Sequence, residues 1–144
     1  MSGAKKMSLR SEYRLFQAIP TRWMDNDAYG HVNNVQYYSY FDTAVNQFLV
    51  REGVLDIQNS PIIGLVVETQ CRYAKSIVFP ETVYAGIRVA HMGTSSVRYE
   101  LGLFREDDDS AAAEGYFIHV YVERESNKPT AIPSKMRDVL QKIA

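Results

Sequence analysis

One stretch of this chain, residues 34–52, constrains the fold more than any other. Apolar residues recur in it at spacings of three and four, as they do on one face of an α-helix. These residues are Val35, Tyr38, Phe41, Val45, Phe48 and Leu49. Asp42 is the only charged residue between Asn34 and Val50, and an apolar surface this wide indicates a helix buried on most of its sides. We therefore predict a long buried helix that stops at Gly53.

The remaining segments predict a sheet that curls around this helix. Four of them are predicted to be long strands joined by short turns, as in an antiparallel meander. They are residues 62–74, 81–91, 96–106 and 114–124. An earlier segment, residues 13–23, is predicted to be an edge strand interrupted by Pro20. Residues 134–144 are predicted to form a short helix with Ser134 as its N-cap.

Composition narrows the classes of protein that fit. A chain of 144 residues with 46% hydrophobic and 23% charged residues is typical of one soluble globular domain. The net charge of −1 argues against a nucleic-acid partner, and no apolar run is long enough to span a membrane. The single cysteine, Cys71, fits a cytoplasmic location and excludes a Cys-based zinc site. Residues 1–11 are expected to be a flexible tail without a secretory signal.

The segment RWMDNDAYGHVNN, residues 22–34, concentrates polar residues just before the helix. Asn33 is predicted to be the N-cap, with Gln36 completing a variant of the capping box. If the Asn33 side chain binds an amide further into the first turn, the Asn34 amide stays free at the positive end of the helix. An amide in that position can stabilise a developing oxyanion.

Two further residues of this segment suit the same chemistry. Gly30 allows a tight turn and a close approach to a ligand. Asp27, on the loop that leads into the helix, could act as general base or nucleophile on an electrophile held by the Asn34 amide. Simpler interpretations remain open for these polar residues. Asp25 and Asp27 could be turn formers or surface charges, His31 could be a structural residue, and the asparagines could serve only as caps.

Metal binding is less well supported. The segment DNDAYG starts like a calcium-binding loop, but its fifth position is Tyr29 and its twelfth is Gln36, where that loop requires a glutamate. A site made of Asp25, Asp27 and His31 lacks a diagnostic spacing. We therefore expect neither a metal nor a cofactor.

The run from Arg22 to Ala44 resembles the start of hotdog-fold acyl-CoA thioesterases of the 4-hydroxybenzoyl-CoA thioesterase type. The residues that carry the resemblance are Asp25, Asp27, Gly30, His31, Val32, Asn33, Asn34 and Tyr37. A weaker similarity extends over nearly the whole chain. The resemblance implies an α+β hotdog fold over residues 1–144, in which a curved antiparallel sheet of about five strands wraps one long central helix.

The resemblance also implies an activity and a site. The protein would hydrolyse an acyl-CoA to free acid and CoA, with Asp27 as base or nucleophile and the Asn34 amide polarising the thioester oxygen. His31 falls on a catalytic or site-shaping position. Gly30, Asn33 and Tyr37 fall on positions next to the substrate, with Tyr37 behind the motif. Asp25 would orient the loop.

Other charged residues are secondary candidates. Asp42 stands where a Glu is common in these relatives, and as a charge on a buried helix it is expected to be paired or functional. Glu68 is a weaker candidate. The basic residues available for the CoA phosphates are Arg72, Lys75, Arg88 and Arg98.

The resemblance further implies a homodimer or homotetramer with its active sites at the dimer interface. An acyl-carrier-protein thioester is an alternative substrate. Two alternative functions remain open, a hotdog hydratase or dehydratase and a non-catalytic acyl-CoA binding or sensing module.

Overall fold

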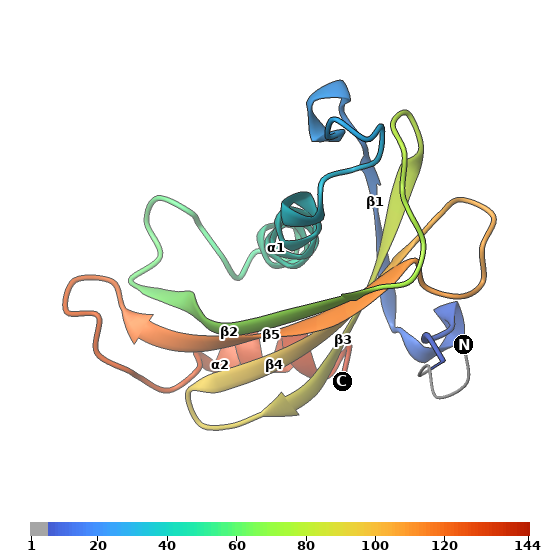
Figure 1. The fold of residues 1–144 in the computed structure, drawn as a ribbon. Helices are drawn as coiled ribbons and strands as arrows, with labels where there is room; N and C mark the ends of the chain where they lie inside the picture. Colours follow the sequence, from blue (N-terminus) through green and yellow to red (C-terminus); the bar gives the residue numbers. More distant parts are fainter. Residues whose placement is uncertain (1–5) are drawn as a thin grey trace.

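Five antiparallel strands curve around one long helix within residues 6–144, the part of the chain that the computed structural model describes (Figure 1). The strands lie in the order β1-β3-β4-β5-β2. Their bounds are β1 Leu15–Pro20, β2 Ile62–Tyr73, β3 Thr82–Met92, β4 Ser96–Phe104 and β5 Ala113–Glu123. Every predicted strand is present, and the edge strand ends at Pro20. The hotdog fold is therefore confirmed.

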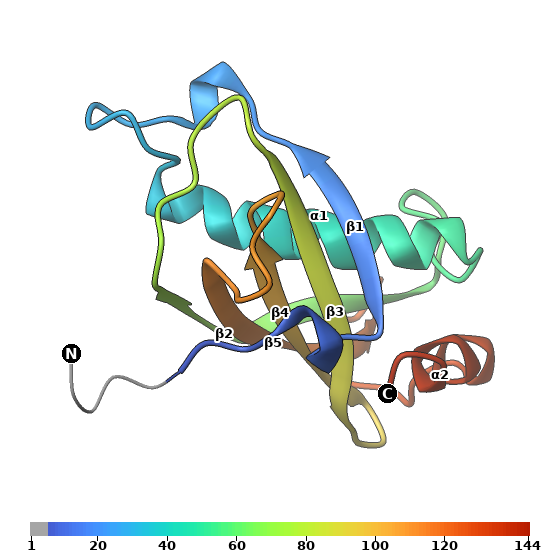
Figure 2. The same ribbon diagram turned by 90° about the vertical axis from the view of Figure 1, so that its right-hand side faces the viewer.

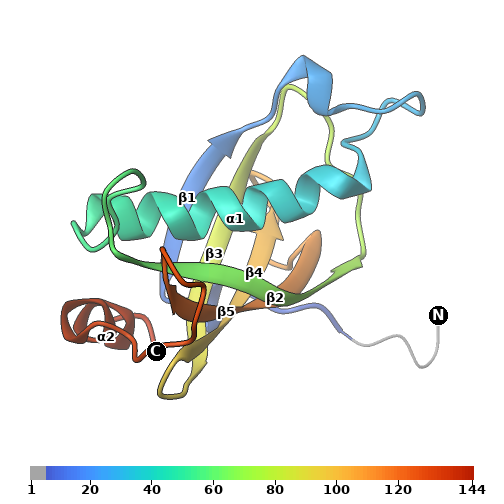
Figure 3. The same cartoon turned by 90° about the vertical axis from the view of Figure 1, so that its left-hand side faces the viewer.

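The central helix α1, Asn34–Arg51, lies across the concave face of the sheet (Figures 1 and 3). Phe41, Ala44 and Val45 are completely or almost completely buried there. They pack in one core with the apolar residues of β3 that alternate toward the same face, such as Val83 and Ile87. The core forms because every second residue of a strand and every third or fourth residue of the helix point to the same side, where the two apolar faces meet.

The sequence had predicted that this helix is buried on most of its sides, and that prediction is wrong for the single chain. Its face away from the sheet exposes Val35, Tyr38 and Val50, because within one chain the sheet covers only one side of α1. Asp42 also lies on the exposed part, where it accepts a hydrogen bond of 3.0 Å from the Asn46 side-chain amide. Asp42 therefore needs no buried partner, and the argument that it must be paired or functional is wrong for the single chain.

Strand β2 is also incompletely covered. It is an edge strand whose only neighbour among the described residues is β5, so its outer backbone groups are free to pair. It exposes three consecutive apolar residues, Leu65, Val66 and Val67, with Val67 at 61%. An unpaired edge that also exposes apolar side chains is typical of an interface.

The terminal helix α2, Ser134–Gln141, packs its buried face, Met136, Val139 and Leu140, into the same core. Its N-cap residue is Pro133, and no side-chain cap bond is formed. The prediction of Ser134 as N-cap is therefore wrong by one position. Proline, which fixes φ, sets the extended backbone that precedes the first turn.

The N-terminal segment lies on the face of the sheet opposite α1 (Figure 2). A short 3₁₀ turn, Arg10–Glu12, follows an isolated bridge between Leu9 and Ser110. The Arg10 guanidinium donates hydrogen bonds of 2.7 Å to the carbonyls of Asp108 and Arg105. Leu9 and Arg10, in the predicted tail of residues 1–11, therefore contact the segment between β4 and β5, and residues 1–5 of that prediction lie outside the described residues.

Candidate active site

Asp25 anchors the loop that leads into α1. Its side chain is fully buried, and it accepts hydrogen bonds from the Arg22 amide (2.8 Å), the Arg22 guanidinium (2.9 and 3.1 Å) and the Tyr40 hydroxyl (2.9 Å). Burial alone would raise the pKa of Asp25, but these donors outweigh burial and lower that pKa below its usual value. Since its carbonyl also accepts from the Asn33 amide at 2.8 Å, Asp25 joins the loop to the helix start.

Asp25→Asn is expected to lower the free energy of unfolding by about 2 kcal/mol at neutral pH, because charge-assisted hydrogen bonds to a buried carboxylate are lost. The pKa of Asp25 is lower in the folded state. Its contribution is therefore present above about pH 4, the unfolded value, and is lost as pH falls through the folded value. Urea unfolding at several pH values measures this effect. Asp107→Asn, an exposed aspartate, is the control, and an equal loss in both variants would contradict the assignment.

A tight turn holds Asp27. Its amide donates to the His31 carbonyl at 2.7 Å, and its carbonyl accepts from the Gly30 amide at 3.1 Å. One carboxylate oxygen, Oδ1, accepts from the amides of Tyr29 at 2.8 Å and His31 at 3.4 Å. Within the described residues the other oxygen, Oδ2, makes no hydrogen bond, so it remains available to a water or a substrate.

Gly30 closes this turn with a φ of +83°, a backbone conformation that favours glycine. Gly30→Ala is expected to reduce any activity of the site several-fold, since backbone strain of about 1 kcal/mol would displace the Asp27 carboxylate. Gly53 is a matched control. It has a φ of +74°, and an added Cβ would meet no atom within 4 Å at either glycine. Gly53→Ala should reduce stability similarly and leave activity unchanged. Equal activities of the two variants, measured by steady-state kinetics, would contradict the expected role of the turn.

The start of α1 presents one free donor. The Asn33 side chain accepts from the Val35 amide at 3.1 Å, which confirms Asn33 as the N-cap. Gln36 donates its own amide to the Asn33 carbonyl at 2.9 Å, but its side chain returns no hydrogen bond among residues 6–144, so the capping box is incomplete. In the same residues no hydrogen bond uses the Asn34 amide. The Tyr73 hydroxyl donates to the Asn34 carbonyl at 3.1 Å and ties this first turn to β2.

A pocket of about 350 Å³ brings several of the predicted site residues together. Its walls are Asp27, His31, Val32, Asn34, Tyr37, Tyr73, Ala74, Lys75 and Ser76. Tyr37 forms the back of the pocket, packed edge-to-face on Tyr73 with ring centroids 4.8 Å apart, and burial raises its pKa. Gly30 and Asn33 are not in the wall and act through the turn and the cap.

Four wall residues were missed or left undecided by sequence reasoning: Tyr73, Ala74, Lys75 and Ser76. They directly follow or end β2, and the sheet topology alone places the end of β2 beside the start of α1. Of the four basic candidates for the CoA phosphates, Lys75 is the one at this pocket. Its ammonium group lies 3.2 Å from an Asp108 carboxylate oxygen and 2.9 Å from the Ser110 hydroxyl.

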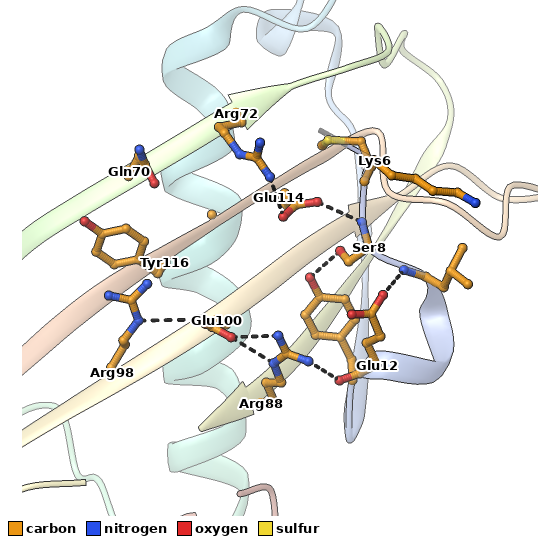
Figure 4. A pocket seen from close by; sticks show the side chains of 14 residues that line it. Lys6, Ser8, Glu12, Gln70, Arg72, Arg88, Arg98, Glu100, Glu114 and Tyr116 are labelled. Atoms are coloured by element: carbon orange, nitrogen blue, oxygen red, sulfur yellow. Dashed lines mark hydrogen bonds and ion pairs between the residues drawn. The ribbon is translucent and has the colours of Figure 1, made fainter. Parts of the chain in front are cut away.

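The other three basic candidates lie around a separate pocket of about 430 Å³ on the outer face of the sheet (Figure 4). Arg72 pairs with Glu114 at 2.8 Å, and Glu100 pairs with Arg88 at 2.7 Å and with Arg98 at 3.4 Å. Their charges are therefore largely offset. Glu68 also belongs to β2 but accepts from the Tyr116 hydroxyl, and it does not line the Asp27 pocket.

Residues 6–144 contain neither a cluster arranged to bind a metal nor a helix that could span a membrane. No group of three or more His, Cys, Asp or Glu side chains in this range is arranged to hold a metal ion. Asp25 faces Arg22 and Tyr40, away from any shared site with Asp27. No helix in the same range has both the length and the apolar character needed to cross a membrane.

The fold and the sequence together can be compared with the Thioesterase-like superfamily. The sequence profile of this superfamily matches residues 21–140, and the chain belongs to it. The PA5185 protein from Pseudomonas aeruginosa strain PAO1 has 53% sequence identity to this chain. Its crystal structure superimposes with a TM-score of 0.93, over 95% of this chain and 96% of that one.

Two further solved structures are similar. The PA2801 protein from Pseudomonas aeruginosa is 30% identical, with a TM-score of 0.83 over 89% of this chain and 98% of that one. The DHNA-CoA thioesterase from Staphylococcus aureus is 22% identical, with a TM-score of 0.77 over 88% of this chain and 86% of that one. The similarity to the staphylococcal protein supports the fold alone.

Proposed function

We propose that this protein is an acyl-CoA thioesterase that hydrolyses its substrate to a free acid and CoA. The observation that carries the proposal is the pocket in which the free Asn34 amide and the Asp27 carboxylate lie together at the positive end of α1. Membership of the Thioesterase-like superfamily supports the reaction class. The staphylococcal protein of the same fold is named for a CoA thioester, which supports CoA as the thiol.

In the proposed reaction the thioester oxygen accepts a hydrogen bond from the Asn34 amide, which strengthens as negative charge develops on that oxygen. Asp27 removes a proton from water as the water attacks the carbonyl carbon, or attacks that carbon itself to form an anhydride that water then hydrolyses. In both routes the carbon–sulfur bond breaks and CoA leaves as the thiolate, which takes up a proton. This chemistry requires neither a metal nor a cofactor.

The remaining predicted residues have supporting roles in this proposal. His31 and Tyr37 shape the pocket around the thioester, and Gly30 and Asn33 fix the turn and the cap that position Asp27 and Asn34. Lys75, at the pocket wall, is the candidate for a CoA phosphate, because its ammonium group can exchange Asp108 for a phosphate.

We also propose that the working protein is a homodimer, or a tetramer built from such dimers, formed by pairing of two β2 edges. The free edge of β2 and the exposed Val66 and Val67 support a second copy of this chain as the occupant. Pairing would extend the sheet and would cover the exposed face of α1.

The test of the activity is thiol release from short, medium, long and aryl acyl-CoAs. The proposal predicts that at least one CoA thioester is cleaved to equimolar acid and thiol, and parallel carrier-protein thioesters would show whether CoA is the preferred thiol. Binding of acyl-CoA without any thiol release would instead indicate a sensing module. Hydration of an enoyl-CoA without hydrolysis would indicate a hydratase.

A further inference from the structure

A third cavity, of about 440 Å³, lies between the C-terminal half of α1 and strands β2 and β5. Its walls combine apolar residues, such as Leu49, Ile63 and Met136, with the charged residues Asp42 and Arg124. Within one chain it is separate from the Asp27 pocket, because it includes Asn46, which lies about 18 Å along the helix from Asn34 at ~1.5 Å per residue. Its volume is in the range of small-molecule sites.

One buried polar side chain in this cavity has no partner. His119, on β5, is only 3% exposed, and its ring packs between Phe117 and Tyr99 with centroid distances of 4.8 and 5.4 Å. Its Nδ1 atom is buried without a hydrogen bond. Nε2 also makes no hydrogen bond within residues 6–144. The ring therefore has unused hydrogen-bonding capacity in the wall of this cavity.

Gly64 leaves the space that this ring uses. It lines the cavity from β2, and an added Cβ at residue 64 would lie 2.8 Å from His119 Nδ1. A side chain at residue 64 would therefore push the imidazole out of its position. Glycine at residue 64 therefore allows the imidazole of His119 to keep its place in the wall of the cavity.

An imidazole without partners is costly to bury, so its presence points to a ligand that supplies a hydrogen bond. Burial lowers the pKa of His119 to about 4, so that near neutral pH the ring is uncharged, with one nitrogen as donor and the other as acceptor. A neutral ring that can offer one donor and one acceptor suits an uncharged polar group, such as a hydroxyl or a carbonyl.

The β2 pairing proposed above relates this cavity to the Asp27 pocket. If two copies of β2 overlap fully and antiparallel about a two-fold axis, the Ile62 end of one strand lies beside the Tyr73 end of the other. Ile63 and Gly64 line the His119 cavity, and Tyr73 lines the Asp27 pocket. The cavity of one subunit would then lie next to the Asp27 pocket of the second subunit.

We propose that this cavity receives the acyl group of the substrate, and that His119 selects an apolar acyl group of medium size that carries one hydroxyl or carbonyl. The inference rests on the proposed thioesterase function and names the substrate class of that site. His119 is a specificity-determining residue in this account, and it takes no part in the cleavage of the thioester.

Matched ligands test the inference. We would measure binding of octanoyl-CoA and 8-hydroxyoctanoyl-CoA, and of phenylacetyl-CoA and 4-hydroxyphenylacetyl-CoA, to the Asp27→Asn protein, which should bind without turnover. At least one hydroxylated ligand should bind about 5-fold to 10-fold more tightly than its parent, as expected for one added hydrogen bond. His119→Phe and Gly64→Ala should both abolish that preference, whereas His91→Phe, at an exposed histidine, should retain it.

A spectroscopic measurement keeps the test independent of variants that fail to fold. The chain has three histidines, so the ¹⁵N ring signals can be assigned individually, and the preferred hydroxylated ligand should shift the His119 signals and leave those of His91 unchanged. Asp27-dependent hydrolysis with neither a preference nor a His119 shift would overturn this inference alone, leaving water as the partner of the ring. Failure of every CoA thioester to bind or react would overturn the proposed function and this inference together.

Discussion

Asp27→Asn is expected to lower kcat/KM for acyl-CoA hydrolysis by about 10²-fold or more. The asparagine side chain has the same shape and can still accept the hydrogen bond that Asp27 Oδ1 takes from the Tyr29 amide. It has no basic or nucleophilic carboxylate oxygen in place of Oδ2. The loop should therefore remain folded while the chemical step is lost, and the dissociation constant for acyl-CoA should change little.

Steady-state thiol release together with equilibrium binding separates these two effects. Asp107→Asn removes an equivalent charge from an exposed turn and should retain the wild-type rate. An Asp27→Asn protein that hydrolyses acyl-CoA at the wild-type rate would exclude Asp27 as base or nucleophile. The reaction would then need another group of the pocket.

The second large effect is expected from a charge in the free edge strand. Val67→Arg should convert the proposed dimer to monomers, because Val67 is 61% exposed on β2 and a charged side chain near the two-fold axis would have to lose its hydration when the two edges pair. If the acyl pocket is completed by the second subunit, hydrolysis should fall together with the dimer fraction, by at least tenfold at concentrations where only monomer remains.

The matching control introduces an arginine into β1, the edge strand on the opposite side of the sheet. Ala18→Arg introduces an arginine at an exposed position of β1 and should leave both the molecular mass in solution and the activity unchanged. Light scattering and kinetics on the same samples measure the two quantities. A Val67→Arg protein that stays dimeric, or that stays fully active as a monomer, would contradict the proposed assembly.

Sequence periodicity was sufficient for the elements of this fold. The long helix and the strands follow from repeats of three to four and of two, and the N-cap at Asn33 follows from its side-chain chemistry. The clustering of Asp27, His31 and Asn34 could also be predicted, because these residues are neighbours in one short loop. The N-cap and this loop depend on residues that are close together in the sequence, so they can be predicted from it.

Features that depend on distant segments were not predictable in the same way. Tyr73 and Lys75 reach the Asp27 pocket only because β2 runs antiparallel to β5 and ends beside α1. Arg88 and Arg98 became paired with Glu100 through the strand register. The exposed face of α1 was mispredicted because an apolar pattern does not say whether the same chain or a second copy covers it.

The most direct test of this account is the position of a bound thioester analogue. We would determine a crystal structure with a non-hydrolysable acyl-CoA ketone, in which a methylene replaces the thioester sulfur. The carbonyl oxygen is expected about 3 Å from the Asn34 amide nitrogen, with Asp27 facing the carbonyl carbon directly or through one water. A carbonyl group held anywhere else, with the Asn34 amide unused, would contradict the proposal that this helix start and this aspartate cleave the thioester.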